Sequence, residues 1–86
     1  MKKNPLIAFS NITRVRILAC LSSDCHNVGC LIQKCQLSQS AVSQHLQKLK
    51  EIGFIDYDVR GQNRVYRLIQ PQAGIISQQI LQLINR

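Results

Sequence analysis

The sequence predicts one small, mainly helical domain that carries a single β-hairpin. Two observations set the element types: apolar residues recur at helical spacing over most of the chain, and one stretch alternates strictly around a glycine-containing turn. A third is the length of 86 residues, which suffices for one hydrophobic core but not for an enclosed enzyme cavity as well. We therefore expect four helices, two strands and a fifth helix, in that order.

The first three expected helices build the core. Residues 6–9 form a short helix introduced by Pro5. Asn11 can cap a second helix that runs to Leu21, and this helix has so few polar positions that it must be covered on more than one side. Asn27 can cap a third helix. The residues of the third helix that we expect to point inward are Val28, Leu31, Ile32 and Cys35.

A fourth helix is expected between Ser38 and Gly53. The Ser38 hydroxyl can accept a hydrogen bond from a free backbone N–H of the first turn, and Gly53 can end the helix. Val42, Leu46 and Leu49 recur at helical spacing and give one apolar face. The opposite face is polar with a single acidic residue, and a merely solvated surface is the alternative explanation for it.

The polar side of this fourth helix has the chemistry of a DNA-reading surface. A helix that enters the major groove needs short hydrogen-bonding side chains near its N-terminus, because bulky ones would hold its backbone away from the bases. Gln can pair with adenine through two hydrogen bonds, and Ser is permissive. The residues that we expect to contact DNA are Gln39, Ser40, Ser43 and Gln44 for the bases, with Gln47 beside them and Lys48 on the flank for phosphate.

A hairpin is predicted after this helix. Apolar and polar residues alternate over residues 55–60, which is typical of a half-buried strand. Residues 60–64 are the expected turn, with Gly61 and Asn63 as the residues most tolerant of left-handed backbone. Residues 65–69 form the expected returning strand.

The expected tip of the hairpin is basic. Arginines at a projecting tip suit a narrow minor groove or the phosphates beside it. The alternative for Arg64 and Arg67 is an ion pair across the strands with Asp56 or Asp58. We favour the ion pair for Arg67 and the DNA contact for Arg64. The hairpin residues that we expect to hold phosphate or minor groove are Arg60, Gln62, Asn63 and Arg64.

The last expected helix, residues 72–86, carries an apolar stripe that Ala73 flanks. A domain of this size cannot bury both this stripe and the first helix within itself, so a partner surface is needed. Homodimerisation through the first and last helices meets this need, and the alternative is that the last helix folds back on its own core. The residues that we expect at the dimer interface are Leu6, Phe9, Ile76, Ile80, Leu83 and Ile84.

The charge balance is strongly basic. The chain has 11 Lys and Arg against 4 Asp and Glu, a net charge of +7 and a pI near 9.8. Such an excess on a small chain points to nucleic acid or an anionic membrane as the partner. No apolar run approaches the length of a membrane span, and the start lacks the apolar core of a signal peptide, so we expect a cytoplasmic protein.

Four segments, NITRVRILACL, NVGCLIQKCQL, LSQSAVSQHLQKLKEIGFI and RGQNRVYRL, cover most of the chain. They resemble the second helix, third helix, recognition helix and wing of the ArsR/SmtB family of transcriptional repressors. The resemblance implies a winged helix-turn-helix homodimer that represses its own or a neighbouring operon. It also implies release from double-stranded DNA by an inducer, usually a metal or a thiol oxidant.

Four cysteines lie five residues apart, which is neither a zinc-finger spacing nor a Cys-x-x-Cys redox motif. The family has apolar side chains at the positions of Cys20 and Cys35, so these two are expected in the core. Cys25, in a loop, and Cys30, facing outward from the third helix, are expected near the surface with His26 alongside. This pair could take a soft metal, arsenite or a disulfide.

Both inducer sites that the resemblance implies lack their ligands here. The family's thiolate pair would fall on Asn27 and Gly29, and the segment after Gln70 offers only Gln, Asn and Arg where the family has Asp, His and Glu. The cytosol also keeps thiols reduced. We therefore favour structural or inert thiols and no firm cofactor, with a thiophilic metal or metalloid at Cys25 and Cys30 as the alternative.

Nothing in the chain suggests catalysis. Ser43 and His45 face different ways without an orienting carboxylate on their helix, so a Ser–His nucleophile is not expected. His45 is expected to be packed or to touch phosphate, and His26 to be solvated. The sequence thus predicts a sequence-specific regulator that binds an inverted repeat. The alternative is a winged-helix module that binds another protein, which would lack salt-dependent retention on DNA.

Overall fold

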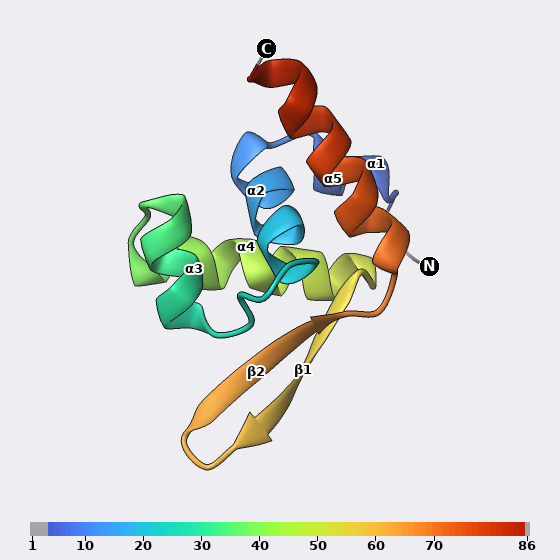
Figure 1. Cartoon of the computed structure of the whole chain (residues 1–86). Helices are drawn as coiled ribbons and strands as arrows, with labels where there is room; N and C mark the ends of the chain where they lie inside the picture. Colours follow the sequence, from blue (N-terminus) through green and yellow to red (C-terminus); the bar gives the residue numbers. More distant parts are fainter. Residues whose placement is uncertain (1–3, 86) are drawn as a thin grey trace.

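The computed structural model describes residues 4–85. Its elements are α1 (Leu6–Phe9), α2 (Ile12–Leu21), α3 (Val28–Cys35), α4 (Gln39–Ile52), β1 (Ile55–Arg60), β2 (Asn63–Leu68) and α5 (Pro71–Ile84). The expected order of elements is therefore confirmed. Figure 1 shows the helices gathered in one body and the hairpin projecting from it. No helix within residues 4–85 is long and apolar enough to cross a membrane.

α2 lies at the centre of this body. It contacts α1, α3, α4, α5 and β2, which confirms that this apolar helix is covered on more than one side. The Asn11 side chain fixes its start by accepting hydrogen bonds from the N–H groups of Thr13 and Arg14. The buried residues of α2 are Val15, Ile17, Leu18 and Leu21.

The hairpin turn is shorter than expected. Arg60 pairs with Asn63, so the turn consists of Gly61 and Gln62 alone and the expected five-residue turn is wrong. Gly61 has a φ of 62°, whereas Asn63 lies in β2 and is not left-handed. A positive φ at the first central residue followed by a negative φ at the second is the pattern of a type II′ turn. Its twist matches that of the flanking strands, which lets them stay paired up to the tip.

α5 uses two different faces. Its small residues Ala73, Gly74 and Ser77 are buried and pack against α2, while larger apolar residues remain exposed. A Cβ added at Gly74 would overlap the Cβ of Ser22 and lie 2.9 Å from Leu68 Cδ1, so the close approach of the two helices requires glycine.

Two expectations about α5 need correction. The helix folds back on its own core through its small face, so Ala73 is not at the edge of a partner-facing stripe. It also begins at Pro71 and not one residue later, because proline at the first helical position loses no hydrogen bond. Arg86, the last residue of the expected helix, lies outside the described residues.

Candidate nucleic-acid interface

α3 and α4 form a helix-turn-helix whose turn is fixed by local signals. α3 ends at Gln36, which adopts a left-handed conformation with a φ of 55°. Two residues later the Ser38 hydroxyl accepts a hydrogen bond from the N–H of Ala41, which starts α4. Gly53, with a φ of 97°, ends α4. Both predicted ends of the fourth helix are confirmed.

Burial of one face of α4 presents the other face to solvent. Val42, Leu46 and Leu49 are buried in the core, as expected from their spacing. The opposite side is polar, and Gln47 Nε2 donates a 3.5 Å hydrogen bond to Glu51 on it. The exposed residues predicted to contact DNA on this side are Gln39, Ser40, Ser43, Gln44 and Gln47.

An open groove of about 690 Å³ lies between α4, the start of α3 and the hairpin. Of the residues predicted to contact DNA, Gln39 and Ser43 of α4 line this groove together with Arg60, Gln62, Asn63 and Arg64 of the hairpin. The structure thus brings the two predicted DNA-contacting segments onto one hollowed surface. Ser40, Gln44 and Gln47 are exposed on α4 outside the groove lining, and Lys48 is half-buried.

The start of α3 belongs to the same groove, and sequence reasoning did not place it there. Asn27, Val28 and Gly29 line the groove together with the hairpin, to which Val65 and Tyr66 of β2 also contribute. The Asn27 cap itself was predicted, and its side chain accepts a 2.8 Å hydrogen bond from the N–H of Cys30. Which helix end faces the hairpin is a tertiary contact that no local pattern reveals.

The two arginines at the tip point to opposite faces of the hairpin. Arg64 lies opposite Val59 and on the same face as Tyr57, whereas Arg60 lies opposite Asn63 on the other face. The guanidinium of Arg64 sits 4.4 Å from the centroid of the Tyr57 ring. A hydrogen bond with Tyr66, together with the two neighbouring tyrosines, raises the pKa of Arg64, which therefore stays cationic.

Arg67 is held by ion pairs. Its guanidinium lies 3.3 Å from Asp58 Oδ2 and 4.0 Å from Asp56 Oδ2. The predicted cross-strand pairing of Arg67 is therefore confirmed. The pairs are at least 40% exposed at every side chain, so their contribution to stability is small. Their effect is that the two aspartates largely neutralise the charge of Arg67, which leaves it less available to an anionic partner.

His45 packs between α4 and α2 and does not face the groove. Its Nδ1 lies 3.5 Å from Nη1 of Arg14, whose Nη2 donates to the carbonyl of Ile7 at 2.8 Å. Burial, and secondarily the charge of Arg14, lowers the pKa of His45 below its usual 6.5. Of its two predicted roles, packing is the one that the structure supports.

The family model described as "Bacterial regulatory protein, arsR family" matches residues 11–57, more than half of the chain. The chain belongs to this family. HlyU from Vibrio cholerae is 31% identical, with a TM-score of 0.79 over 94% of this chain and 88% of that one. HlyU from Vibrio vulnificus, a transcriptional regulator, is 35% identical, with a TM-score of 0.77 over 91% and 81%. A search of curated proteins finds no match.

A third solved relative is the AntR antimony-specific transcriptional repressor, 27% identical with a TM-score of 0.77 over 93% of this chain and 73% of that one. Membership of the arsR family identifies the chain as a DNA-binding transcriptional regulator, which is not an enzyme. The predicted family and winged helix-turn-helix fold are confirmed.

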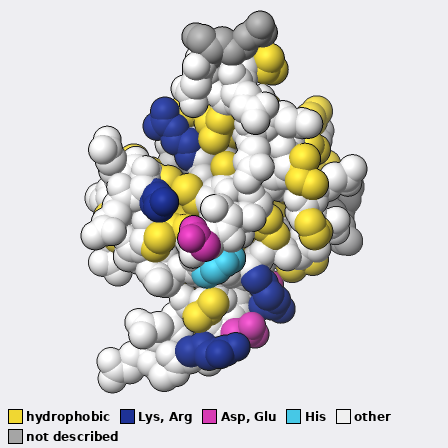
Figure 2. All heavy atoms as spheres, viewed as in Figure 1, with side chains coloured by type: hydrophobic (Ala, Val, Ile, Leu, Met, Phe, Trp, Pro, Cys, Tyr) yellow, Lys and Arg dark blue, Asp and Glu magenta, His cyan; other side chains and the backbone are white. Residues whose placement is uncertain are grey.

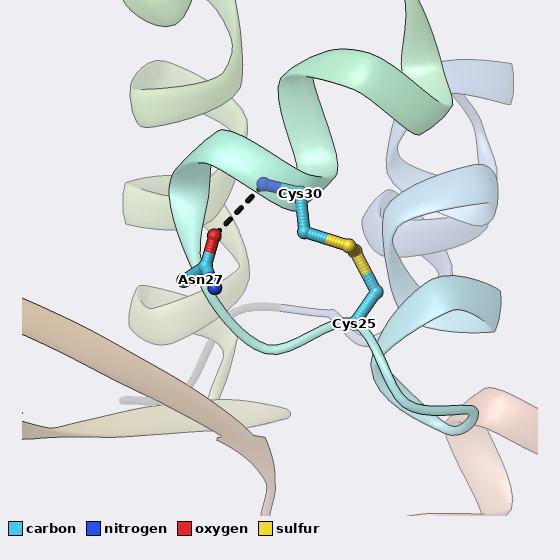
Figure 3. The surroundings of a disulfide bond; sticks show 3 residues. All are labelled: Cys25, Asn27 and Cys30. Carbon is cyan, nitrogen blue, oxygen red and sulfur yellow. Dashed lines mark hydrogen bonds between the residues drawn. A yellow bond between two sulfur atoms is a disulfide. The ribbon is translucent and has the colours of Figure 1, made fainter.

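In this arsR-family chain, Cys25 and Cys30 form a disulfide that ties the loop before α3 to its first turn (Figure 3). Their Cα atoms are 5.7 Å apart. The expectation of an exposed pair is wrong, because Cys25 is 1% exposed and Cys30 half-buried against the core. A soft metal, arsenite and a disulfide were the three possibilities for this pair, and the structure contains the disulfide. Bonded sulfurs are not thiolates, and the described residues contain no group of three or more potential metal ligands.

His26 connects this disulfide loop to the hairpin. Its carbonyl accepts a 2.7 Å hydrogen bond from the N–H of Tyr66 in β2. The histidine is half-buried, and its Nδ1 is buried with no hydrogen-bond partner among residues 4–85, so the expectation of a solvated side chain is wrong. The burial of His26 results from a contact between distant segments, because β2 packs against the loop that contains this residue.

An apolar surface lies on α1 and α5, away from the groove of the arsR-type helix-turn-helix. Leu6, Ile76, Leu83 and Ile84 are 38–70% exposed, and Figure 2 shows hydrophobic side chains on this side of the molecule. Ile80 is half-buried. Phe9, the other residue predicted for the dimer interface, is partly buried and contacts Phe54 with ring centroids 5.7 Å apart.

Proposed function

We propose that the protein is a homodimeric transcriptional repressor that binds an inverted repeat in double-stranded DNA. The observation that carries this proposal is the groove that Gln39 and Ser43 share with Arg60 and Arg64. A groove with hydrogen-bonding side chains on one wall and cations on the other suits a DNA strand, whose bases and phosphates need those two chemistries. Its place of action would be the cytoplasm, where bacterial DNA lies.

In this proposal, α4 contacts the bases and the hairpin contacts the DNA backbone. The short side chains near the start of α4 can approach base edges in the major groove. The hairpin, with Arg60 and Arg64 on opposite faces, can contact the adjoining phosphates or minor groove from two sides. The base-reading residues in this proposal are Gln39, Ser40, Ser43 and Gln44, with Gln47 beside them, and the backbone-binding residues are Lys48, Arg60, Gln62, Asn63 and Arg64.

A second copy of the chain is the proposed occupant of the α1 and α5 surface. α5 already packs against α2 through its small face, yet a groove of about 430 Å³ remains beside Leu6, Phe9 and Ile76. A twofold dimer would cover this exposed apolar surface and would place two recognition helices on successive major grooves. Ile80, Leu83 and Ile84 would extend the interface along the helix.

DNA binding would respond to the redox state of Cys25 and Cys30. Their disulfide holds the loop whose His26 carbonyl binds Tyr66, and the start of α3 lines the DNA-facing groove. Reduction would free the loop, and affinity for DNA would change only by the difference in binding between the two states. The relative AntR, an antimony-specific repressor, supports ligand-controlled repression in general and no particular ligand here.

The test is selection of bound sequences from a random duplex pool, with and without reductant. We expect enrichment of an inverted repeat whose half-site centres are about 10 base pairs or a multiple apart. Enrichment of single half-sites would refute the dimer, and no enrichment would refute sequence-specific binding. Equal affinity with and without reductant would refute the redox response while leaving the rest of the proposal intact.

A further inference from the structure

Three of the four cysteines line one small pocket. The pocket has a volume of about 280 Å³ and lies between α2, α3 and α5. Cys20, Cys25 and Cys35 open onto it, and the charged residues around it are Arg16, Asp24 and Lys34. The proposed DNA contacts use none of these residues.

Cys20 shares this pocket with Cys25 and Cys35. Its carbonyl accepts a 3.4 Å hydrogen bond from the N–H of Cys25, which holds the backbones of the two residues together. Cys20 and Cys35 are free thiols, the first half-buried and the second buried, whereas Cys25 is bonded to Cys30. Two free thiols therefore share one pocket with Cys25 of the disulfide.

We propose that this pocket is a thiol–disulfide exchange centre, through which the Cys25–Cys30 disulfide is transferred to the Cys20–Cys35 pair. The Cys20 thiolate attacks Sγ of Cys25; the Cys20–Cys25 bond forms, the Cys25–Cys30 bond breaks, and Cys30 leaves with the electron pair and takes up a proton. The Cys35 thiolate then attacks Sγ of Cys20, and Cys25 leaves with the electron pair and takes up a proton. The attacking thiols release two protons and the leaving thiolates take up two, so no external oxidant or reductant is needed.

The order of the two attacks follows from the surroundings of the thiols. Burial, then the charge and the hydrogen bond of Cys20, raise the pKa of Cys35 to about 11, and the charge of Arg16 lowers it only in part. Cys35 is therefore a protonated, weak nucleophile near neutral pH. Once Cys20 is bound in a disulfide it carries no charge, so one cause of the raised pKa of Cys35 disappears at the step in which Cys35 must react.

The transfer would move a covalent tie from one end of α3 to the other. In the Cys25–Cys30 form, the loop is tied to the first turn of α3; in the Cys20–Cys35 form, α2 is tied to the last residue of α3 and the loop carrying His26 is free. Its effect on DNA affinity rests on the redox response proposed above. The exchange itself is measured without DNA, so each idea can fail alone.

The sequence provides a direct readout. Trypsin cleaves after Arg16, Lys34 and Lys48, which places Cys20, Cys25 and Cys30 together in residues 17–34 and Cys35 alone in residues 35–48. A Cys25–Cys30 disulfide stays within one peptide, whereas a Cys20–Cys35 disulfide links the two. Full-length protein with one disulfide per chain is incubated without reductant, its free thiols are blocked with N-ethylmaleimide, and the tryptic peptides are weighed by mass spectrometry.

We expect the linked peptide in the wild-type protein and its loss to background in Cys20→Ala. Absence of the linked peptide from the wild type would overturn the proposal. A linked peptide that persists in Cys20→Ala would overturn the role of Cys20, because Cys35 would then react with the loop disulfide directly. Cys20→Ser serves as a second variant if the alanine variant loses its helical circular dichroism.

The rate of formation of the linked peptide adds a second test. The attack by Cys35 is the slower step, and its rate should rise with pH between about pH 7 and about pH 9, because burial, the largest cause of the raised pKa of Cys35, persists after Cys20 is bound in a disulfide and keeps the thiolate fraction of Cys35 small. A rate independent of pH over this range would contradict the assignment of Cys35 as the second attacking thiol.

Discussion

The close contact between α2 and α5 predicts that replacing glycine by alanine has opposite effects on stability at two sites. The substitution should destabilise the protein at Gly74 and stabilise it at Gly29. Gly74→Ala would place a Cβ against the Cβ of Ser22, 2.9 Å from Leu68 Cδ1 and 3.0 Å from Ser22 Oγ. Gly29→Ala, also in a helix, would meet only Asn27 Oδ1, at 3.4 Å. The change in chemistry is the same, and only the space differs.

The magnitudes follow from two opposing effects. Replacing glycine by alanine in a helix stabilises the folded state by up to about 1 kcal/mol, and overpacking costs about 1–3 kcal/mol. The overlap with the Cβ of Ser22 places the overpacking cost near the upper end of this range, so Gly74→Ala should lower the free energy of unfolding by about 2 kcal/mol, which in a domain of this size corresponds to about 8–16 °C in melting temperature. Gly29→Ala should raise it by a few tenths to about 1 kcal/mol.

The assay is urea unfolding followed by circular dichroism, at one fixed protein concentration because dimerisation would couple stability to concentration. A Gly74→Ala variant as stable as the wild type would refute the account of close packing between α2 and α5. Loss of stability in both variants would show that glycine is needed for some reason other than the space at Gly74.

Four further outcomes are expected. Gln44→Ala should weaken binding to the selected operator by about 1–3 kcal/mol per half-site with little change on random duplex, as measured by fluorescence anisotropy; equal losses on both would show that α4 does not read sequence. Arg60→Ala combined with Arg64→Ala should reduce the slope of log K against log salt by about two per protomer, whereas an unchanged slope would mean that the hairpin stays off the DNA. Ile76→Glu should yield monomers or unfolded chains in sedimentation, because an unpaired charge in an apolar interface is costly, and a monomeric wild type would disprove the interface. The pKa of His45 is lowered in the folded state, so the unfolded chain binds more protons and the free energy of unfolding should decrease as the pH falls through about 6.5; His45→Gln should remove part of this decrease, and an unchanged pH profile would contradict the assignment.

Local signals were enough to predict the helix ends. Asn11, Asn27 and Ser38 act as caps through hydrogen bonds within three residues, and Gly53 ends α4 through its own backbone conformation. Such interactions depend on a few neighbours in the chain, so the sequence contains all of their participants. The apolar spacing of α4 was equally informative about burial.

The errors concern contacts between distant segments. Cys25 is buried and His26 half-buried because other elements cover their loop, which no spacing of cysteines reveals. The spacing of its large residues predicts one apolar face for α5, although its small residues, and Gly74 above all, form a second face against α2. The hairpin turn was predicted too long, because the residues of a tight turn also resemble those of a looser loop.

The two-residue turn at Gly61 and Gln62 fixes the pairing register of β1 and β2. It thereby also determines which charged side chains share a face of the hairpin. A slip of the pairing by one residue would turn Arg64 toward the aspartates and Arg67 toward Tyr57. The same side chains would then present a different distribution of charge. A lineage could therefore alter how this hairpin meets a polyanion by changing its turn, without substituting a single arginine.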